Sequence, residues 1–208
     1  MFEVITDYSL AEYSWDYKQP LGNLHDNTKH LPFNTRIEQL ISNRPICMID
    51  FGCAGGGIVE DFIDRGHLAI GLDGSDASYL IKRACWGKIP NNLFLCDCAR
   101  PFQVLCNSQP FKADVITSFE FFEHIYREDI PKVCDNIKNL LNKDGFSIHS
   151  IALFESGHHV TWKDKEWWFY IFEQNGLRIR PDILSEFEKY QLPHFNQLGE
   201  RLYIVLSL

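Results

Sequence analysis

The chain has 208 residues and a formal net charge of −8, with 45% hydrophobic and 23% charged residues, so bulk disorder is excluded and one globular domain is expected. The acidic balance argues against binding to nucleic-acid phosphates, which requires a basic face. No apolar run reaches the roughly 18 residues of a membrane span, and the acidic, aromatic N-terminus lacks the features of a signal peptide.

The seven cysteines are an odd number, and no C-x-x-C pair occurs among them. A chain of this length builds its core without disulfides. We therefore expect reduced thiols in a cytoplasmic compartment and no zinc ribbon.

The first part of the chain alternates predicted strands and helices. Residues 1–45 are expected to form an N-terminal cap that includes a short helix over 34–42. A continuous apolar run, which suits a strand covered on both faces, then predicts a strand over 46–51. The elements that follow are a glycine-rich turn over 52–57, a helix over 58–65, a strand over 68–73, a helix over 76–87 with Asp76 as its N-cap, and a strand over 93–97.

The second part continues this alternation, which is typical of an α/β protein with a parallel sheet and helices on both faces. Its predicted elements are a strand over 114–119, an amphipathic helix over 130–141, a turn at Asp144–Gly145, a strand over 146–151, a helix over 165–174, and strands over 177–179 and 202–206. Little helix separates the last two strands. We therefore expect them to form an antiparallel pair at one edge of the sheet.

Ligands of such sheets bind beyond the carboxyl ends of the strands. The turn Gly52–Gly57 lets a ligand approach the backbone closely, and the helix that follows offers free N–H groups to an anion. Asp73 ends the next strand, where a carboxylate can accept hydrogen bonds from ribose hydroxyls. Asp97 ends the third strand, where it can bind an adenine amino group. These features predict an adenosine-containing cofactor.

Two cofactors fit such a turn. A nicotinamide dinucleotide requires G-x-G-x-x-G, which Gly52, Ala54 and Gly57 match with alanine in the middle. S-adenosylmethionine fits a similar turn, because its methionine carboxylate replaces the pyrophosphate as the anion. The chain leaves little room for a hydride-acceptor domain, and no Tyr-x-x-x-Lys occurs. S-adenosylmethionine is therefore favoured over a dinucleotide.

Residues 46–151 resemble a class I S-adenosylmethionine-dependent methyltransferase. IDFGCAGG resembles the D-x-G-x-G-x-G motif, GLDGSD the ribose motif, LCDCARPF the adenine motif and DVITSFEFFEHI the fourth-strand motif, in the family's order. The sequence departs from the family at Ala54, where glycine is usual. The resemblance implies a Rossmann-like, doubly wound, mostly parallel seven-stranded sheet whose last strand is antiparallel.

The resemblance also implies a division of the single domain 1–208 and a set of cofactor contacts. Residues 46–151 would form the cofactor-binding core, and 152–208 the substrate-side segment and edge strands. The glycine turn would hold the methionine end of the cofactor, and the next two motifs would hold its ribose and adenine. The implied cofactor-binding residues are Asp50, Gly52, Cys53, Ala54, Gly55, Gly56, Asp73, Gly74, Ser75, Asp97, Cys98, Phe119 and Glu120.

The acceptor is indicated by the segment after the fifth predicted strand. The target-amine signature is absent after strand four, and a sugar hydroxyl would need a base to take its proton. The stretch H-H-V-T-W…W-W…F…N-G-L over 158–177 shows a looser resemblance to methyltransferase domains of surface-glycan synthesis. We therefore predict O-methylation of a sugar hydroxyl. The candidate catalytic residues are His159 as first choice of base, then His158, His124 and Glu120, and the candidate substrate-binding residues are Trp162 and Trp167.

Other interpretations stay open at this stage. The alternatives are methylation of another small molecule, a non-catalytic cofactor-binding module and, less favoured, an NAD-dependent oxidoreductase. Glu123 is more readily explained as the start of a helix than as a catalytic group. No metal is expected on the pair His158–His159, because adjacent residues in an extended segment point to opposite sides. The expected partner is a small-molecule or glycan acceptor, with no nucleic acid and an undetermined oligomeric state.

Overall fold

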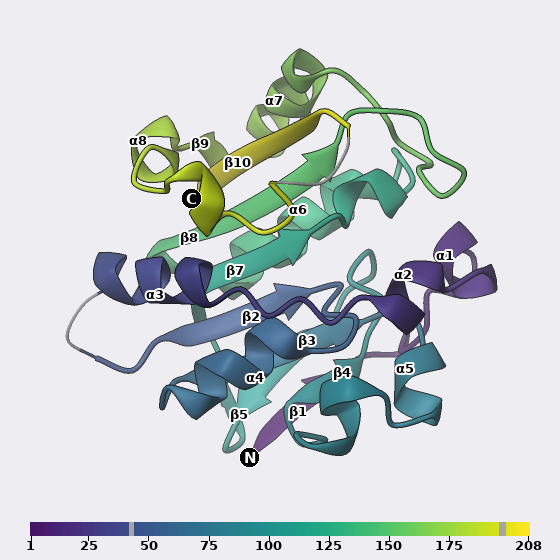
Figure 1. Cartoon of the computed structure of the whole chain (residues 1–208), viewed down its shortest axis with the longest axis vertical. Helices are drawn as coiled ribbons and strands as arrows, with labels where there is room; N and C mark the ends of the chain where they lie inside the picture. Colours follow the sequence, from purple (N-terminus) through teal and green to yellow (C-terminus); the bar gives the residue numbers. More distant parts are fainter. Residues whose placement is uncertain (42–43, 196–198) are drawn as a thin grey trace.

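A seven-stranded sheet forms the centre of the protein (Figure 1). The structure is a computed structural model that describes residues 1–41, 44–195 and 199–208. The strands in spatial order are β4 (Leu93–Leu95), β3 (Leu68–Asp73), β2 (Cys47–Phe51), β7 (Ala113–Phe119), β8 (Leu141–Ala152), β10 (Arg201–Ser207) and β9 (Arg178–Ile179). Neighbouring strands are parallel except that β10 is antiparallel to both β8 and β9. The predicted Rossmann-like α/β fold is confirmed, including its antiparallel last strand.

Helices cover both faces of this sheet, because successive side chains of a strand point to opposite faces. In β2, Met48 packs into the cluster that also holds Phe33 of α3 (Leu31–Leu40) and Phe62 of α4 (Gly57–Asp64). The next residue, Ile49, packs into the opposite cluster, with helices α6 (Ile130–Leu140) and α7 (Lys165–Gln174). Figure 1 shows α4 in front of the sheet and α6 behind it. This double cover explains why the central strands are continuous apolar runs.

The chain order reverses between β2 and β7. From β2 the chain moves outward through β3 to β4, and it then returns to place β7 on the other side of β2. The connections that leave the carboxyl ends of β2 and β7 therefore run to opposite sides of the sheet. The crevice between such connections is the place where α/β sheets bind ligands.

The predicted helix over 76–87 is wrong as a single element. It is broken into α5 (Ala77–Leu80) and a 3₁₀ helix, η1 (Ala84–Gly87). Lys82, between them, and Ala84, at the start of η1, have φ angles of +50° and +49°, which lie outside the α-helical region. The guanidinium of Arg83 donates hydrogen bonds to backbone carbonyls of the N-terminal segment, and this tertiary contact overrides the helical pattern.

The predicted turn at Asp144–Gly145 is also wrong, because both residues lie within β8. The pairing of β8 with β7 passes from Ala113–Leu141 to Val115–Phe146, so the additional residues form an irregularity in the ladder. The predicted helix over 34–42 corresponds to α3, although position 42 lies outside the described residues.

A second, three-stranded antiparallel sheet was not predicted. It consists of β1 (Phe2–Ile5), β5 (Gln103–Cys106) and β6 (Gln109–Pro110). Because β1 pairs with a strand far along the chain, no local sequence pattern predicts this sheet. The remaining short elements are α1 (Trp15–Lys18), α2 (Leu21–His25), η2 (Phe122–His124), α8 (Pro181–Leu184) and η3 (Lys189–Gln191).

Two further findings concern membrane-spanning helices and the state of the cysteines. Within the described ranges, no helix combines the length and the apolar character needed to cross a bilayer. All seven cysteines are free thiols.

Candidate active site

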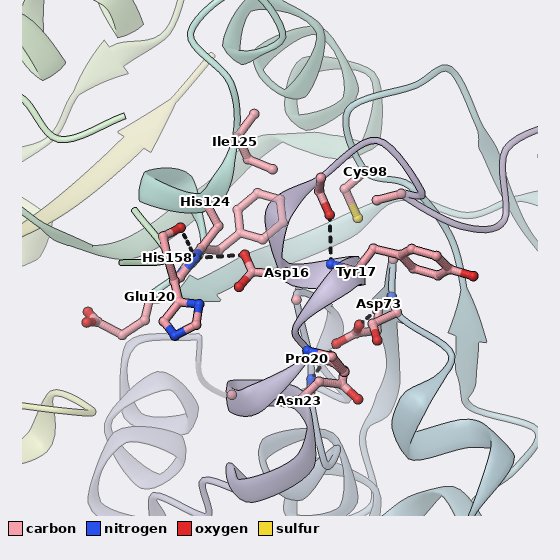
Figure 2. A pocket seen from close by; sticks show the side chains of 18 of the residues that line it. Asp16, Tyr17, Pro20, Asn23, Asp73, Cys98, Glu120, His124, Ile125 and His158 are labelled. Carbon is pink, nitrogen blue, oxygen red and sulfur yellow. Dashed lines mark hydrogen bonds and ion pairs between the residues drawn. The ribbon is translucent and has the colours of Figure 1, made fainter. Parts of the chain in front are cut away.

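A cavity of about 290 Å³ lies at the carboxyl ends of β2, β3, β4 and β7. Its walls come from the residues that follow these strands and from the N-terminal segment that covers them. Figure 2 shows Asp73 and Cys98 at one side of this cavity and Glu120, His124 and His158 at the other. From the predicted cofactor set, the lining includes Gly52, Ala54, Asp73, Gly74, Ser75, Asp97, Cys98, Phe119 and Glu120.

The turn after β2 is held open by its backbone conformation. Gly52 and Gly56 have φ angles of +71° and +80°, and Ala54 has +44°. A Cβ atom on Gly52 would lie 2.8 Å from the ring of Phe121, so only glycine fits there. The amides of Gly52 and Cys53 donate to the carbonyl of Leu72 in β3, which ties the turn to the neighbouring strand.

Asp73 organises two of these turns at once. Its carboxylate accepts hydrogen bonds from the backbone N–H of Ala54, at 2.8 Å, and from that of Ser75, at 2.9 Å. Burial raises the pKa of Asp73 to about 6, so the carboxylate is still ionised at neutral pH. The side chain of Asn23 also donates to this carboxylate, which leaves acceptor capacity for a hydrogen bond from a ribose hydroxyl.

Asp97 lies in the same wall, after β4. Its Oδ1 accepts hydrogen bonds from the hydroxyl of Tyr13, at 3.2 Å, and from the backbone N–H of Ala99, at 2.9 Å. Arg100 stacks over the ring of Tyr13 at 4.4 Å. Tyr13 therefore closes the cavity over the carboxylate that we expect to bind adenine.

Asp50 lies behind the glycine turn and outside the lining of the main cavity. It lines a small adjacent pocket together with Gly52, Cys53 and Ala54. Thr117 donates a hydrogen bond of 2.6 Å to its carboxylate. Burial raises the pKa of Asp50 to about 7. The other two members of the predicted set, Gly55 and Gly56, line neither pocket.

Both histidines that follow β8 line the cavity, as does His124. Burial lowers the pKa of His159, so its ring is neutral at pH 7, and the carbonyl of Phe154 lies 2.8 Å from Nδ1. Burial by itself would lower the pKa of His124. The carboxylate of Asp16, at 2.8 Å from Nδ1, has the larger opposite effect, so the pKa of His124 is raised to about 9. His159 therefore suits the role of a base better than His124.

Glu120 also lines the cavity, but neighbouring donors hold its carboxylate. Oε1 accepts from the hydroxyl of Ser150, at 2.8 Å, and Oε2 accepts from Nε of Arg201, at 2.9 Å. Its backbone has a φ of +53°. This geometry fits a wall residue of fixed orientation better than a proton acceptor.

The predicted substrate-binding tryptophans lie outside the cavity lining. Trp162 is 45% exposed. Trp167 packs edge-on against Trp168 and carries the guanidinium of Arg127 over its ring at 5.6 Å. The loop between Ala152 and α7 therefore contributes histidines to the cavity, whereas Trp162 of this loop and Trp167 of α7 lie outside its lining.

The N-terminal segment supplies lining residues that sequence reasoning did not assign. The backbone N–H of Ala11 donates to the carbonyl of Gly74, and that of Asp97 donates to the carbonyl of Tyr8. The only signal in the sequence was the dense acidic and aromatic composition of this stretch. Its lining residues are Ala11, Tyr13, Ser14, Asp16, Tyr17, Pro20, Gly22, Asn23 and Asp26.

The sheet order and the cavity at its switch point, with a glycine turn and two following carboxylates, define the class of Rossmann-like methyltransferases. A family of methyltransferase domains matches residues 26–192, and the chain belongs to this family. The predicted relation to S-adenosylmethionine-dependent methyltransferases is thereby confirmed.

Solved structures agree with this fold. A TehB-like SAM-dependent methyltransferase from Corynebacterium glutamicum is 21% identical, with 94% of this chain and 97% of that chain covered and a TM-score of 0.60. An S-adenosylmethionine-dependent methyltransferase from Clostridium acetobutylicum is 13% identical, with 93% and 98% covered and a TM-score of 0.61. The glycopeptide N-methyltransferase MtfA in complex with S-adenosyl-L-methionine is 9% identical, with 88% and 96% covered and a TM-score of 0.56. No curated protein matches the chain in sequence.

Proposed function

We propose that this protein transfers the methyl group of S-adenosylmethionine to a hydroxyl oxygen of a small polar acceptor, a sugar in glycan synthesis being the first choice. The observation that carries the proposal is the position of His159 on the wall of the proposed cofactor cavity, where burial lowers its pKa and favours the neutral ring. A sugar hydroxyl is too weak an acid to react without losing its proton, and a neutral imidazole can accept it.

In this proposal the donor would be held by the residues that the motifs predicted. Asp73 would accept the ribose hydroxyls, Asp97 and the backbone of Cys98 would bind the adenine, and the turn at Gly52 would hold the methionine end. The transferable methyl group would then lie toward Phe119, on the side of the cavity that holds the histidines.

Methyl transfer in this arrangement is an in-line displacement. The acceptor oxygen forms a bond to the methyl carbon while the bond from that carbon to sulfur breaks, and S-adenosylhomocysteine leaves. The hydroxyl proton goes to His159. The cofactor brings the electrophile, so the protein contributes position and the proton acceptor.

The setting of the enzyme belongs to the same proposal. A reducing, cytoplasmic compartment is supported by seven free thiols, five of which are buried. We also propose that residues 1–208 act as one domain, since the N-terminal segment and the core share the cavity wall.

The proposed binding of the methyl donor is tested by isothermal titration calorimetry with S-adenosylmethionine, S-adenosylhomocysteine and NAD. We expect the first two to bind and NAD not to bind. Asp73→Ala should weaken S-adenosylmethionine binding by about 1–3 kcal/mol, about 5- to 150-fold, through lost hydrogen bonds. Asp76→Ala is the matched control, because Asp76 lies three residues away and outside the lining. Unchanged affinity in Asp73→Ala would contradict the ribose assignment.

The proposed transfer to a sugar hydroxyl is tested by a screen of sugars, sugar nucleotides and oligosaccharides in which the release of S-adenosylhomocysteine is measured. We expect His159→Ala to bind the donor normally and to slow transfer about 10²–10⁴-fold. Full activity in this variant would remove His159 from the mechanism. Donor binding without turnover of any acceptor would instead indicate a non-catalytic cofactor-binding module.

A further inference from the structure

Glu123 is a buried carboxylate beside the cavity, and the proposed chemistry does not use it. Its residue is fully buried within η2. Oε1 accepts a hydrogen bond of 3.0 Å from the backbone N–H of Ala152. Oε2 is buried and has no hydrogen-bond partner among the residues that the structure describes. A buried carboxylate oxygen without a partner is costly, so a ligand for it is expected.

Two histidines lie next to this carboxylate. A carboxylate oxygen of Glu123, one ring nitrogen of His124 and one ring nitrogen of His159 all lie within 4.8 Å of one another. The two rings meet edge to face, with centroids 5.2 Å apart. One histidine comes from the segment after β7 and the other from the loop after β8, so the fold and not the sequence brings them together.

The surroundings hold both rings in a fixed orientation. Nδ1 of His124 lies 2.8 Å from Asp16 and 3.2 Å from the carbonyl of His158 (Figure 2). Nδ1 of His159 lies 2.8 Å from the carbonyl of Phe154. Acceptors at Nδ1 keep a proton there, which is the arrangement found around metal-binding histidines. On His124 an ion that binds at Nε2 displaces the second ring proton.

The backbone supports the same arrangement. The N–H groups of Val160 and Thr161 donate to the carbonyl of Glu123 at 2.9 and 3.0 Å. These bonds fasten the loop that carries His159 directly onto the residue that carries the carboxylate. The three side chains are therefore held together before any ligand arrives.

We propose that Glu123, His124 and His159 bind one divalent transition-metal ion, which in turn binds the acceptor hydroxyl beside the methyl donor. Two imidazoles and one carboxylate favour ions such as Mn²⁺, Co²⁺ or Zn²⁺ over Mg²⁺ and Ca²⁺. Three protein ligands leave coordination positions open for a substrate oxygen. The sequence-based expectation of no metal concerned the pair His158–His159, whereas this site combines His159 with a histidine from a different segment.

This inference rests on the proposed methyl transfer and refines how the hydroxyl is activated. An ion lowers the pKa of a bound hydroxyl, so its proton is lost to water. The acceptor oxygen then bonds to the methyl carbon as the carbon–sulfur bond breaks. With the ion bound, His159 activates the acceptor as a metal ligand and does not itself take the proton.

The test begins with the full chain, freed of any polyhistidine tag and stripped with a chelator. Calorimetric titration with Mn²⁺, Co²⁺ and Zn²⁺, each alone, should show one ion per chain, and Co²⁺ should give an absorption spectrum of nitrogen–oxygen coordination. Glu123→Gln and His159→Gln should each weaken binding at least about tenfold, and Asp16→Asn about 10–100-fold through loss of orientation of His124. His25→Ala, an exposed histidine outside the lining, is the matched control.

Circular dichroism and S-adenosylmethionine affinity show whether each variant is folded, and His159→Gln, in a partly exposed loop, keeps the test valid should Glu123→Gln not fold. Ion binding that survives in His159→Gln would overturn the site. Release of S-adenosylhomocysteine that is equal before and after chelation would overturn the role of the ion and leave His159 as the base. Failure of the methyltransferase proposal itself is distinct, because the native chain would then not bind S-adenosylmethionine.

Discussion

Ala54 and Glu120 line the cavity with φ angles of +44° and +53°. Side chains with a Cβ atom are disfavoured in this left-handed region by roughly 1–2 kcal/mol. Such strain concentrates where a backbone must take a particular path around a ligand. At Ala54 this backbone conformation allows two hydrogen bonds. The N–H of Ala54 donates to Asp73, and its carbonyl accepts from the indole of Trp86.

We predict that Ala54→Gly stabilises the protein by about 0.5–1 kcal/mol, because glycine adopts this conformation without a steric penalty. The free energy of unfolding in urea measures the effect. Gly52→Ala is the opposite control and should destabilise, since its Cβ would lie 2.8 Å from Phe121. A destabilising Ala54→Gly would show that the alanine is not strained.

Asp50 should make the stability of the protein depend on pH. Burial raises its pKa from 3.8 to about 7 on folding, so the folded chain binds this proton more tightly. The stability that protonation contributes is present below pH 4 and is lost as the pH rises to about 7. Asp50→Asn, which can still accept from Thr117, should therefore be more stable than the native chain at pH 8, by about 1–4 kcal/mol. Denaturation at pH 8, 6 and 4 tests this, and a constant difference would contradict it.

At the residue scale, the sequence located the carboxylates that we expect to bind the cofactor, and it named His124 and His159 as candidate bases, but it did not connect them with Glu123 as ligands of the proposed ion. Asp73 and Asp97 were found because each follows a strand, and carboxyl ends of parallel strands share one edge of the sheet. Glu123 was read as the start of a helix, and it does lie in one. Its proposed role depends on an oxygen that no described residue hydrogen-bonds and on the nearness of His159, and neither is visible in the neighbouring sequence.

At the element scale, the N-terminal segment is the part of the site that depends most on contacts with the rest of the chain for its structure. Helices α1 and α2 are 4 and 5 residues long and bury none of their residues. Such short helices are not stable alone. They are held by contacts to the core, such as the bond from the amide of Gly55 to the carbonyl of Asp26.

We predict that S-adenosylmethionine slows amide hydrogen exchange in residues 11–26 more than in α6. The segment lines the cavity but opens at low cost, so a ligand that touches it suppresses the open state. Hydrogen–deuterium exchange with mass spectrometry, with and without the cofactor, measures this. Equal protection of both regions would mean that the segment does not contact the cofactor.

At the scale of the whole molecule, charge limits the range of acceptors. The chain has 28 acidic and 20 basic residues, and several basic side chains, including Arg44 and Arg65, are engaged by carboxylates. A surface of this kind repels a phosphate backbone and leaves a small neutral acceptor unaffected. This agrees with a polar small molecule in the proposed reaction.

We therefore expect binding of random-sequence DNA or RNA to be weaker than about 10⁻⁴ M at physiological salt. Fluorescence anisotropy with a labelled oligonucleotide checks this, with a basic nucleic-acid-binding protein as the positive control. Binding in the micromolar range would return nucleic acid to the list of acceptors.

The sequence by itself determined the central strands, the glycine turn and the carboxylates that follow the strands. These features are local: an apolar run, a cluster of glycines and a terminal acid depend on neighbours within a few residues. Only the tertiary structure decided the rest, namely the pairing of β1 with β5, the break after α5, the cover of residues 11–26 and the meeting of Glu123, His124 and His159. Each of these depends on contacts between segments far apart in the chain, and the period of a single segment carries no information about its distant partner.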